Sequence, residues 1–283
     1  MIKSIYFPSK TFASKDELFA ELKANEENIL DIKKANIYKG CDKSQTIGKA
    51  IFSDDVTKGL GFATKQNYIY PIISTTKYMD SHDDVHFDGC FTKTVKDQQG
   101  KVYYCADHDL SLKGIVANKK DVEMVVKNID WSIVGKDYQG QTQALIFCID
   151  KTAVKNKEAL ALIESDPELE NSIRMQYVKV MMGIDSKDKQ YALNKQYFDS
   201  RINEISNKDK AMEQGYFFGV EELKIHKEGS LVIAGGSNDA TRIYQETTEP
   251  AKATHVHTEP PNGTQSNKSY LDIAQTILQT FKN

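Results

Sequence analysis

YYCADHD at residues 103–109 is the stretch that decides the fold predicted from this sequence. It is an apolar, strand-like run that ends in His108 and an aspartate, so the imidazole lies where a strand leaves the core, a position that functional groups favour. Two later stretches complete the pattern: YVKVMMGI at 177–184 is a strand-like run with a glycine near its end, and KEGSLVI at 227–233 places Glu228 at the start of a third. The order of the three features is more specific than any one of them.

The three stretches resemble the tailed-phage prohead (capsid maturation) protease family, which shares its fold with the herpesvirus assemblin proteases. The segment DSHDDVHFDGCF at 80–91 is similar to the D-x-x-x-D-V-x-x-x-G-x-F segment of that family. The resemblance covers roughly residues 67–242. It implies an α+β fold in which an antiparallel β-barrel of short strands is surrounded by helices, whereas the sequence pattern alone predicts only α+β.

The resemblance also implies roles for individual residues. The general base of the family falls on His108 and its orienting carboxylate on Glu228, while the serine of a Ser-x-Gly-Phe pattern falls on Met181. Acyl transfer needs a side chain that can lose a proton and form an ester or thioester, and a thioether cannot. We therefore expect no peptide hydrolysis. Ser132 is the nearest substitute, but its glycine comes three residues later and it lies closer to His108 than the family order implies.

Simpler interpretations exist for each residue. A single His-Asp at a strand end is usually a surface or capping histidine, Glu228 can be an ordinary turn residue, and methionine is common as flexible core filling. His82 and His86 are spaced as metal ligands on a helix would be, yet their segment is predicted to be a loop that leads into a helix at 91–97. His255 and His257 lie in a polar tail. We expect no specific metal site and no cofactor.

Composition describes a chain without a nucleic-acid or membrane signature. The 283 residues are 40% hydrophobic, and the net charge of −3 with a pI near 6.1 gives no basic surface for nucleic acid. The longest apolar runs are as short as strands, so neither a signal peptide nor a membrane span is expected. Cysteines form no C-x-x-C pair, and we expect reduced thiols at Cys41, Cys90, Cys105 and Cys148.

From residue 67 onward the pattern is mainly that of β-strands. Short β-branched or aromatic runs predict strands at 68–74, 101–105, 122–126, 143–149, 177–182 and 230–234. Helical patterns occupy 155–175 and 188–212, and the second is interpreted as an insertion. The protease-like domain is predicted to span 63–243.

Two arms flank this domain. The N-terminal arm is predicted to be a helical extension over 1–62. Residues 14–17 form a capping box that starts a helix. We expect the apolar face of this helix to be buried against the protein's own sheet or a neighbouring subunit. After residue 243, a polar, proline-containing linker at 244–268 precedes an amphipathic helix at 269–283. Its apolar face is expected to bind a partner or to fold back on its own domain, and it consists of Leu271, Ile277, Leu278 and Phe281.

These features favour a virion structural or head-assembly protein, a catalytically inactive pseudoprotease that acts as a protein-binding scaffold in the phage particle or procapsid. Its expected partners are capsid, portal or other virion proteins, or a second copy of the chain, during assembly in the host cytoplasm. The alternative is an active maturation serine endopeptidase that cleaves capsid or scaffold proteins. A third hypothesis, a peptide-binding regulator of an active protease, uses the same residues. Met181 at the expected nucleophile position favours the first of the three.

Overall fold

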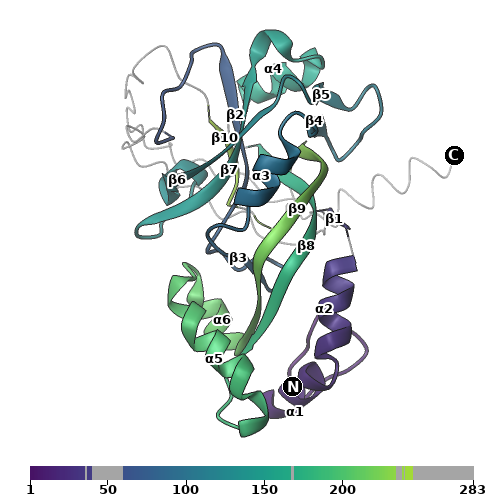
Figure 1. The fold of residues 1–283 in the computed structure, drawn as a ribbon, viewed down its shortest axis with the longest axis vertical. Coiled ribbons are helices and arrows are strands. Elements are labelled where there is room, and N and C mark those ends of the chain that lie inside the picture. The colour runs from purple at the N-terminus through teal and green to yellow at the C-terminus, as the bar shows by residue number, and fades with distance from the viewer. Residues whose placement is uncertain (36, 40–59, 167–168, 234–237, 239, 245–283) are drawn as a thin grey trace, which may run out of the picture. The chain divides into compact units, whose positions relative to one another are not determined.

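The fold is α+β, with helices around two β-sheets (Figure 1). The computed structural model describes residues 1–35, 37–39, 60–166, 169–233, 238 and 240–244. The predicted linker at 244–268, apart from residue 244, and the predicted helix at 269–283 with its partner-binding residues lie outside these ranges. Residues 1–247 form one compact unit, so the N-terminal arm belongs to the same unit as the domain predicted at 63–243.

The first sheet is built on two long antiparallel strands, β8 and β9. The other strands of this sheet are short: β1 pairs with the outer side of β8, β4 lies parallel to β9 and pairs with β5, and β3 pairs with another part of β9. The bounds are β1 (Ile37–Lys39), β3 (Asp84–His86), β4 (Tyr103–Ala106), β5 (Ile115–Ala117), β8 (Glu170–Ile184) and β9 (Tyr216–Val232). Residues of β4, β9 and β8 that are distant in sequence therefore lie side by side.

The second sheet has four strands in the order β10, β2, β7 and β6. Their bounds are β2 (Tyr68–Thr75), β6 (Glu123–Asp130), β7 (Gln141–Asp150) and β10 (Arg242–Tyr244). Side chains alternate between the faces of a strand, so Ile73 and Phe147 join the main core while Ile72 and Ile146 join a second apolar cluster on the other face. Burial on both faces explains why β2 and β7 are nearly continuous apolar runs.

Close contact between the two sheets requires a glycine in β9. A Cβ atom added to Gly229 would lie 2.7 Å from Cε2 of Phe147, which is closer than two carbon atoms can approach. The glycine therefore lets β7 pack directly under β9. Glu228 and Ser230, its chain neighbours, point to the opposite face because side chains alternate along a strand.

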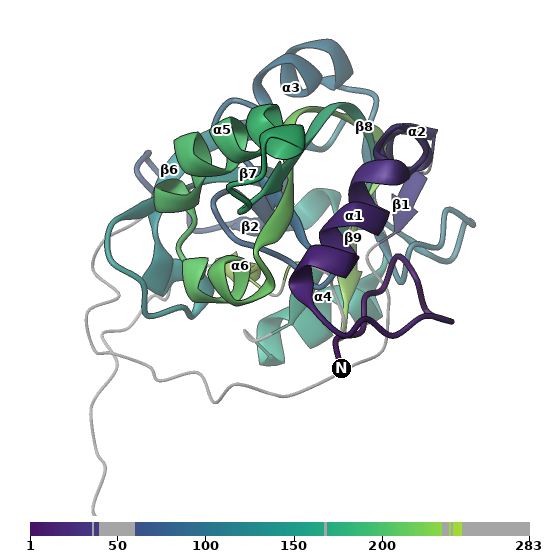
Figure 2. The ribbon, with the colours of Figure 1, turned by 90° about the horizontal axis from the view of Figure 1, so that it is seen from below.

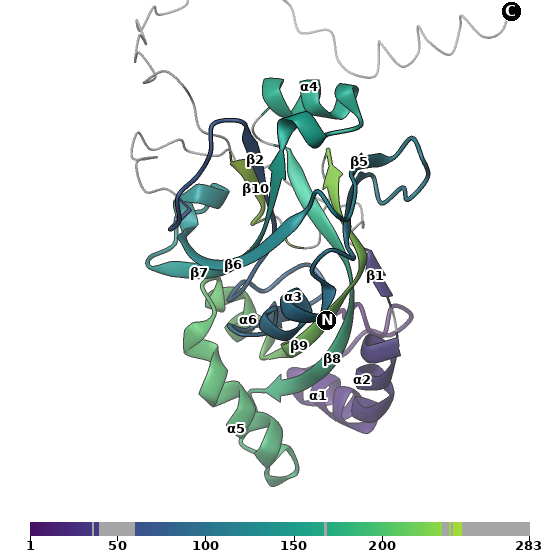
Figure 3. The ribbon, with the colours of Figure 1, turned by 45° about the horizontal axis from the view of Figure 1, so that its top comes forward.

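Helices cover both flanks of the β8–β9 pair. Figures 1 and 3 show α1 (Lys15–Ala24) and α2 (Glu26–Ala35) on one flank and α5 (Ala192–Arg201) and α6 (Lys208–Gln214) on the other, and Figure 2 shows the same arrangement from below. Two further helices lie elsewhere: α3 (Thr92–Gln98), which matches the helix predicted at 91–97, and α4 (Lys157–Ser165). None of the helices in the described ranges has the length and hydrophobicity needed to cross a membrane.

The capping box of the N-terminal arm is present. The hydroxyl of Ser14 accepts a hydrogen bond from the amide of Glu17 at 3.2 Å, and the Glu17 carboxylate accepts one from the amide of Ala13 at 2.8 Å. Leu18, Phe19 and Leu22 are buried in the same core cluster as Ile73 and Phe147. The apolar face of α1 is therefore covered by the protein's own domain.

The helix predicted over 155–175 is wrong in its second half. Helix α4 ends at Ser165, and Glu170–Met175 forms the start of β8, where it pairs with β9. The sheet supplies hydrogen-bond partners along this stretch, and such tertiary pairing overrides a weak local preference for helix. In the 188–212 region the structure has α5 and α6 in place of one continuous helix.

Candidate functional site

His108 and Glu228 are brought together at the junction of β4 and β9. Nδ1 of His108 lies 2.9 Å from Oε1 of Glu228, and the two side chains are 7% and 0% exposed. The turn that carries the histidine is fixed to β9, because the amide of Asp107 donates to the carbonyl of Leu231 at 2.9 Å and the amide of His108 donates to Oγ of Ser230 at 2.8 Å. The resemblance implies that these two residues act together, and the structure places their side chains in contact.

The backbone around this pair is strained. Asp107 and His108 have positive φ angles of 49° and 58°, and Lys227, the residue before Glu228, has a φ of 73°. β-branched and other non-glycine side chains rarely adopt this region, and such residues cluster at functional sites where the surrounding structure holds them in place.

A bulge in β9 sets the position of the Glu228 side chain. Ile173 pairs with Gly229 and Met175 with Ile225, so a single β8 residue lies opposite three residues of β9. Such irregularities re-aim a side chain and are common beside active sites. Here the bulge lies where the Glu228 carboxylate reaches Nδ1 of His108.

Arg174 and Cys105 complete the surroundings of the Glu228 carboxylate. Nε of Arg174 lies 3.0 Å from Oε1, within ion-pair distance although its N–H is not aligned as a hydrogen bond, and Nη2 donates to the carbonyl of His108 at 3.2 Å. The thiol of Cys105 donates to Oε2 at 3.2 Å. The nearby guanidinium offsets the cost of burying a carboxylate.

Cys105 cannot supply the missing nucleophile. Burial, and then the neighbouring Glu228 carboxylate, raise the pKa of the Cys105 thiol far above its usual range. The thiolate is the nucleophilic form of cysteine, and these surroundings disfavour it. Cys105 therefore serves as a hydrogen-bond donor to Glu228.

The geometry selects one tautomer of the histidine. A carboxylate group accepts hydrogen bonds, so the contact with Glu228 fits the tautomer of His108 that carries its proton on Nδ1. The lone pair of the ring is then on Nε2. This is the arrangement of a general base oriented by a carboxylate.

Met181 does not lie at this site. It pairs with Gly219, whereas Gly229, the neighbour of Glu228, pairs with Ile173 eight residues earlier in β8. At roughly 3.3 Å per residue, the separation along the strand is about 25 Å. The side chain is 39% exposed, so the assignment of Met181 to the nucleophile position is corrected by the register of the sheet.

The other substitute considered from the sequence, Ser132, is also elsewhere. It is exposed in a short 3-10 helix, Trp131–Val134, which follows β6 in the second sheet.

Ser172 is the serine that the sheet places beside the pair. Ser172 of β8 pairs with Ser230 of β9, which in turn pairs with Cys105 of β4, so the three residues form one row across adjacent strands. Paired residues direct their side chains to the same face and have Cα atoms about 5 Å apart. Because Oγ of Ser230 contacts the amide of His108, Ser172 lies one strand away from the histidine, on the face that carries Arg174.

Sequence reasoning missed Ser172 for two reasons. The family pattern Ser-x-Gly-Phe was placed on Gly183, and Ser172-Ile173-Arg174-Met175 has arginine where the pattern has glycine. In addition, the helical pattern at 155–175 hides the start of the strand that carries Ser172. The signal in the sequence was Ser172 itself, a few residues after Pro167. It begins a stretch in which polar and apolar residues alternate, as they do in a strand.

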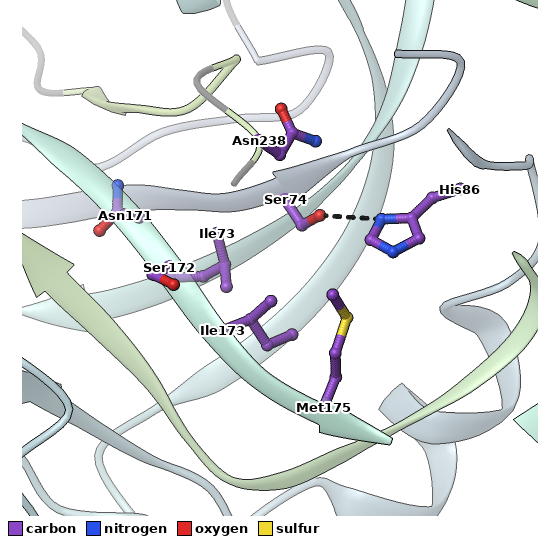
Figure 4. Close-up of a pocket in the computed structure, with 8 residues that line it drawn as sticks. All are labelled: Ile73, Ser74, His86, Asn171, Ser172, Ile173, Met175 and Asn238. Atoms are coloured by element: carbon purple, nitrogen blue, oxygen red, sulfur yellow. Dashed lines mark hydrogen bonds between the residues drawn. The ribbon is translucent and has the colours of Figure 1, made fainter. Parts of the chain in front are cut away.

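A small cavity with a mixed polar and apolar lining adjoins Ser172 (Figure 4). It has a volume of about 10 Å³, and Asn171 and Ser172 of β8, Ser74 of β2, His86 of β3 and Asn238 are among the residues that line it. This is close to the space that one water molecule needs, so the cavity is too small to bind a peptide.

His86 is buried and neutral in this cavity. Burial lowers the pKa of His86 to about 4, and its Nδ1 lies 3.4 Å from Oγ of Ser74. Nε2 is buried and has no hydrogen-bond partner within the described part of the chain. His86 is in strand β3 and not on a helix, so the spacing to His82 does not create a helical ligand pair. In the described ranges, no three His, Cys, Asp or Glu side chains gather to hold a metal ion, and His255 and His257 lie outside these ranges.

Comparisons with models of protein families, with curated proteins and with solved structures found no match to this chain. The geometry of the described residues therefore carries the functional argument.

Proposed function

We propose that this protein is a serine endopeptidase of the prohead maturation type, which cleaves capsid or scaffold proteins during phage head assembly. The observation that carries the proposal is the buried contact between His108 and Glu228 on the sheet face that also carries Ser172. The barrel architecture of that protease family, and an association with procapsids, are parts of the same proposal.

The proposed reaction uses three side chains. His108 takes the hydroxyl proton of Ser172 on Nε2 while Oγ attacks the scissile carbonyl carbon, and His108 then donates that proton to the leaving amine. Water hydrolyses the resulting ester in the reverse sense, and the serine regains its proton. Glu228 holds the imidazole in the required tautomer and stabilises the imidazolium that forms in each half-reaction.

One observation favours an inactive scaffold that binds virion proteins through the same face. Oε1 of Glu228 contacts both His108 and Arg174, at 2.9 and 3.0 Å. A guanidinium this close weakens the attraction between the carboxylate and an imidazolium, because like charges repel in a buried site. This pair of contacts keeps the pseudoprotease as the second candidate.

Labelling with a fluorophosphonate probe decides between the two candidates. We expect the probe to modify Ser172, identified by mass spectrometry of the labelled peptide. The modification should be lost in Ser172→Ala and His108→Ala and retained in the matched variant Met181→Ala, with circular dichroism verifying that all variants are folded. Absence of labelling in the folded wild-type protein, or labelling that persists in Ser172→Ala, would reject the peptidase and leave the scaffold.

A further inference from the structure

Strand β1 occupies the edge of β8 and ends two residues short of the position opposite Ser172. Ile37–Lys39 pairs antiparallel with β8 in a register that places Lys39 opposite Arg174, and β1 is the end strand of the sheet. Figures 1 and 3 show β1 beside β8, just beyond the end of α2. Without β1, the backbone N–H and C=O groups along this edge of β8 could bind an extended peptide by strand addition.

The edge next to Ser172 has a defined end. The hydroxyl of Thr241 accepts from the amide of Asn171 at 3.0 Å and donates to its carbonyl at 3.2 Å, which engages both backbone groups of that residue. Backbone groups alternate in direction along a strand, so those of Ile173 point to the same side. The edge available for strand addition therefore runs from Ile173 to Gln176.

A peptide on this edge would cross the candidate nucleophile. Since β1 runs antiparallel to β8, the chain direction of any peptide in its register leads from Gln176 towards Ser172. Such a peptide needs only two residues beyond the position of Lys39 to lie opposite Ser172. The same backbone groups of β8 cannot pair with β1 and with a peptide at the same time.

Helix α2, immediately before β1, is held by a buried cation. The ammonium group of Lys33 forms an ion pair with Asp84 and lies 4.4 Å from the ring centre of Phe218 and 5.1 Å from that of Tyr6. The Lys33 side chain is 4% exposed. Aromatic rings stabilise a desolvated cation, and a buried pair is costly to break by removing one partner. This contact fixes the end of α2 four residues before β1 begins.

We propose that β1 is an internal competitor for the peptide-binding edge of β8, so that an extended peptide reaches Ser172 only when β1 leaves. The inference rests on the proposed function in treating Ser172 as the nucleophile that the edge serves. A tethered competitor has a high effective concentration, and a peptide binds more weakly in proportion to the fraction of molecules in which the edge is open.

Proline in β1 tests the competition, because strand addition depends on backbone groups. Tyr38→Pro removes an amide and disfavours the ladder, whereas the matched variant Tyr38→Ala keeps the amide. Both are made in a Ser172→Ala background, so that no peptide is consumed. The probe is a fluorescent peptide with the sequence of residues 34–44, with serine in place of Cys41, and fluorescence anisotropy measures its binding.

We expect Tyr38→Pro to bind the peptide at least about tenfold more tightly than the Ser172→Ala parent, and Tyr38→Ala to bind like the parent. Lys39→Pro with Lys39→Ala forms a second matched pair, for use if thermal unfolding shows that Tyr38→Pro is not folded; here proline weakens β1 through its fixed φ angle and not through loss of a ladder amide. Equal affinities of the proline, alanine and parent proteins would overturn the competition.

The two proposals fail separately. Failure of Ser172 to react with the fluorophosphonate, together with tighter peptide binding by the proline variants, would reject the peptidase and retain the competition. A reactive Ser172 with unchanged peptide affinity would retain the peptidase and reject the competition.

Discussion

Replacing Glu228 by glutamine tests whether the buried charge organises the site. Glutamine keeps an oxygen that can accept from Nδ1 of His108 but removes the negative charge that Arg174 faces at 3.0 Å. Removing one partner of a buried ion pair costs about 3–5 kcal/mol of unfolding free energy. The Arg174 side chain is 14% exposed and keeps its bond to the carbonyl of His108, so we expect the lower limit, about 3 kcal/mol.

Urea unfolding of a double-mutant cycle measures this interaction. Glu228→Gln, Arg174→Met and the double variant are compared with wild type, and the matched control is Glu222→Gln, which removes the charge of an exposed pair with Lys93. Each single change at the buried pair should strongly lower the free energy of unfolding. The loss in the double variant should be smaller than the sum of the two single losses by about 1.5 kcal/mol or more. The control variant should change the free energy of unfolding little. Additive effects, or a loss for Glu228→Gln no larger than for Glu222→Gln, would refute the buried ion pair.

Two further predictions follow from the register and from burial. Met181→Ser should not create or increase peptide hydrolysis, because Met181 lies about 25 Å along β8 from Ile173, which pairs with the neighbour of Glu228. A gain of hydrolysis that depends on His108 would contradict the strand pairing. His86 has a pKa lowered by burial to about 4, so its contribution to stability is present above pH 6.5 and is lost as the pH falls towards 4. Thermal unfolding across this range should therefore show wild type losing about 3 kcal/mol relative to His86→Gln, and parallel pH profiles would mean that His86 is not buried as a neutral ring.

The sequence alone determined the class of the fold and one half of the site. The short apolar runs around Ile73, Phe147 and Leu231 predict strands, and all three residues lie in strands of the structure and in its main core. The resemblance to the prohead proteases, and not the local pattern, implied that His108 and Glu228 act together. Their contact at 2.9 Å arises because β4, which ends just before His108, pairs with the part of β9 that carries Glu228.

The tertiary structure decided which residue of β8 faces that pair. A strand register depends on pairing with a distant segment, and a shift of the alignment by nine residues, from Ser172 to Met181, leaves the local sequence pattern equally consistent with a strand. The bulge in β9 that positions Glu228, and the placement of β1 on the edge of β8, likewise depend on contacts between segments far apart in the chain. Hydrogen bonds of this kind have no local signature, so only the folded chain shows that Ser172 and not Met181 lies in the row that leads to His108.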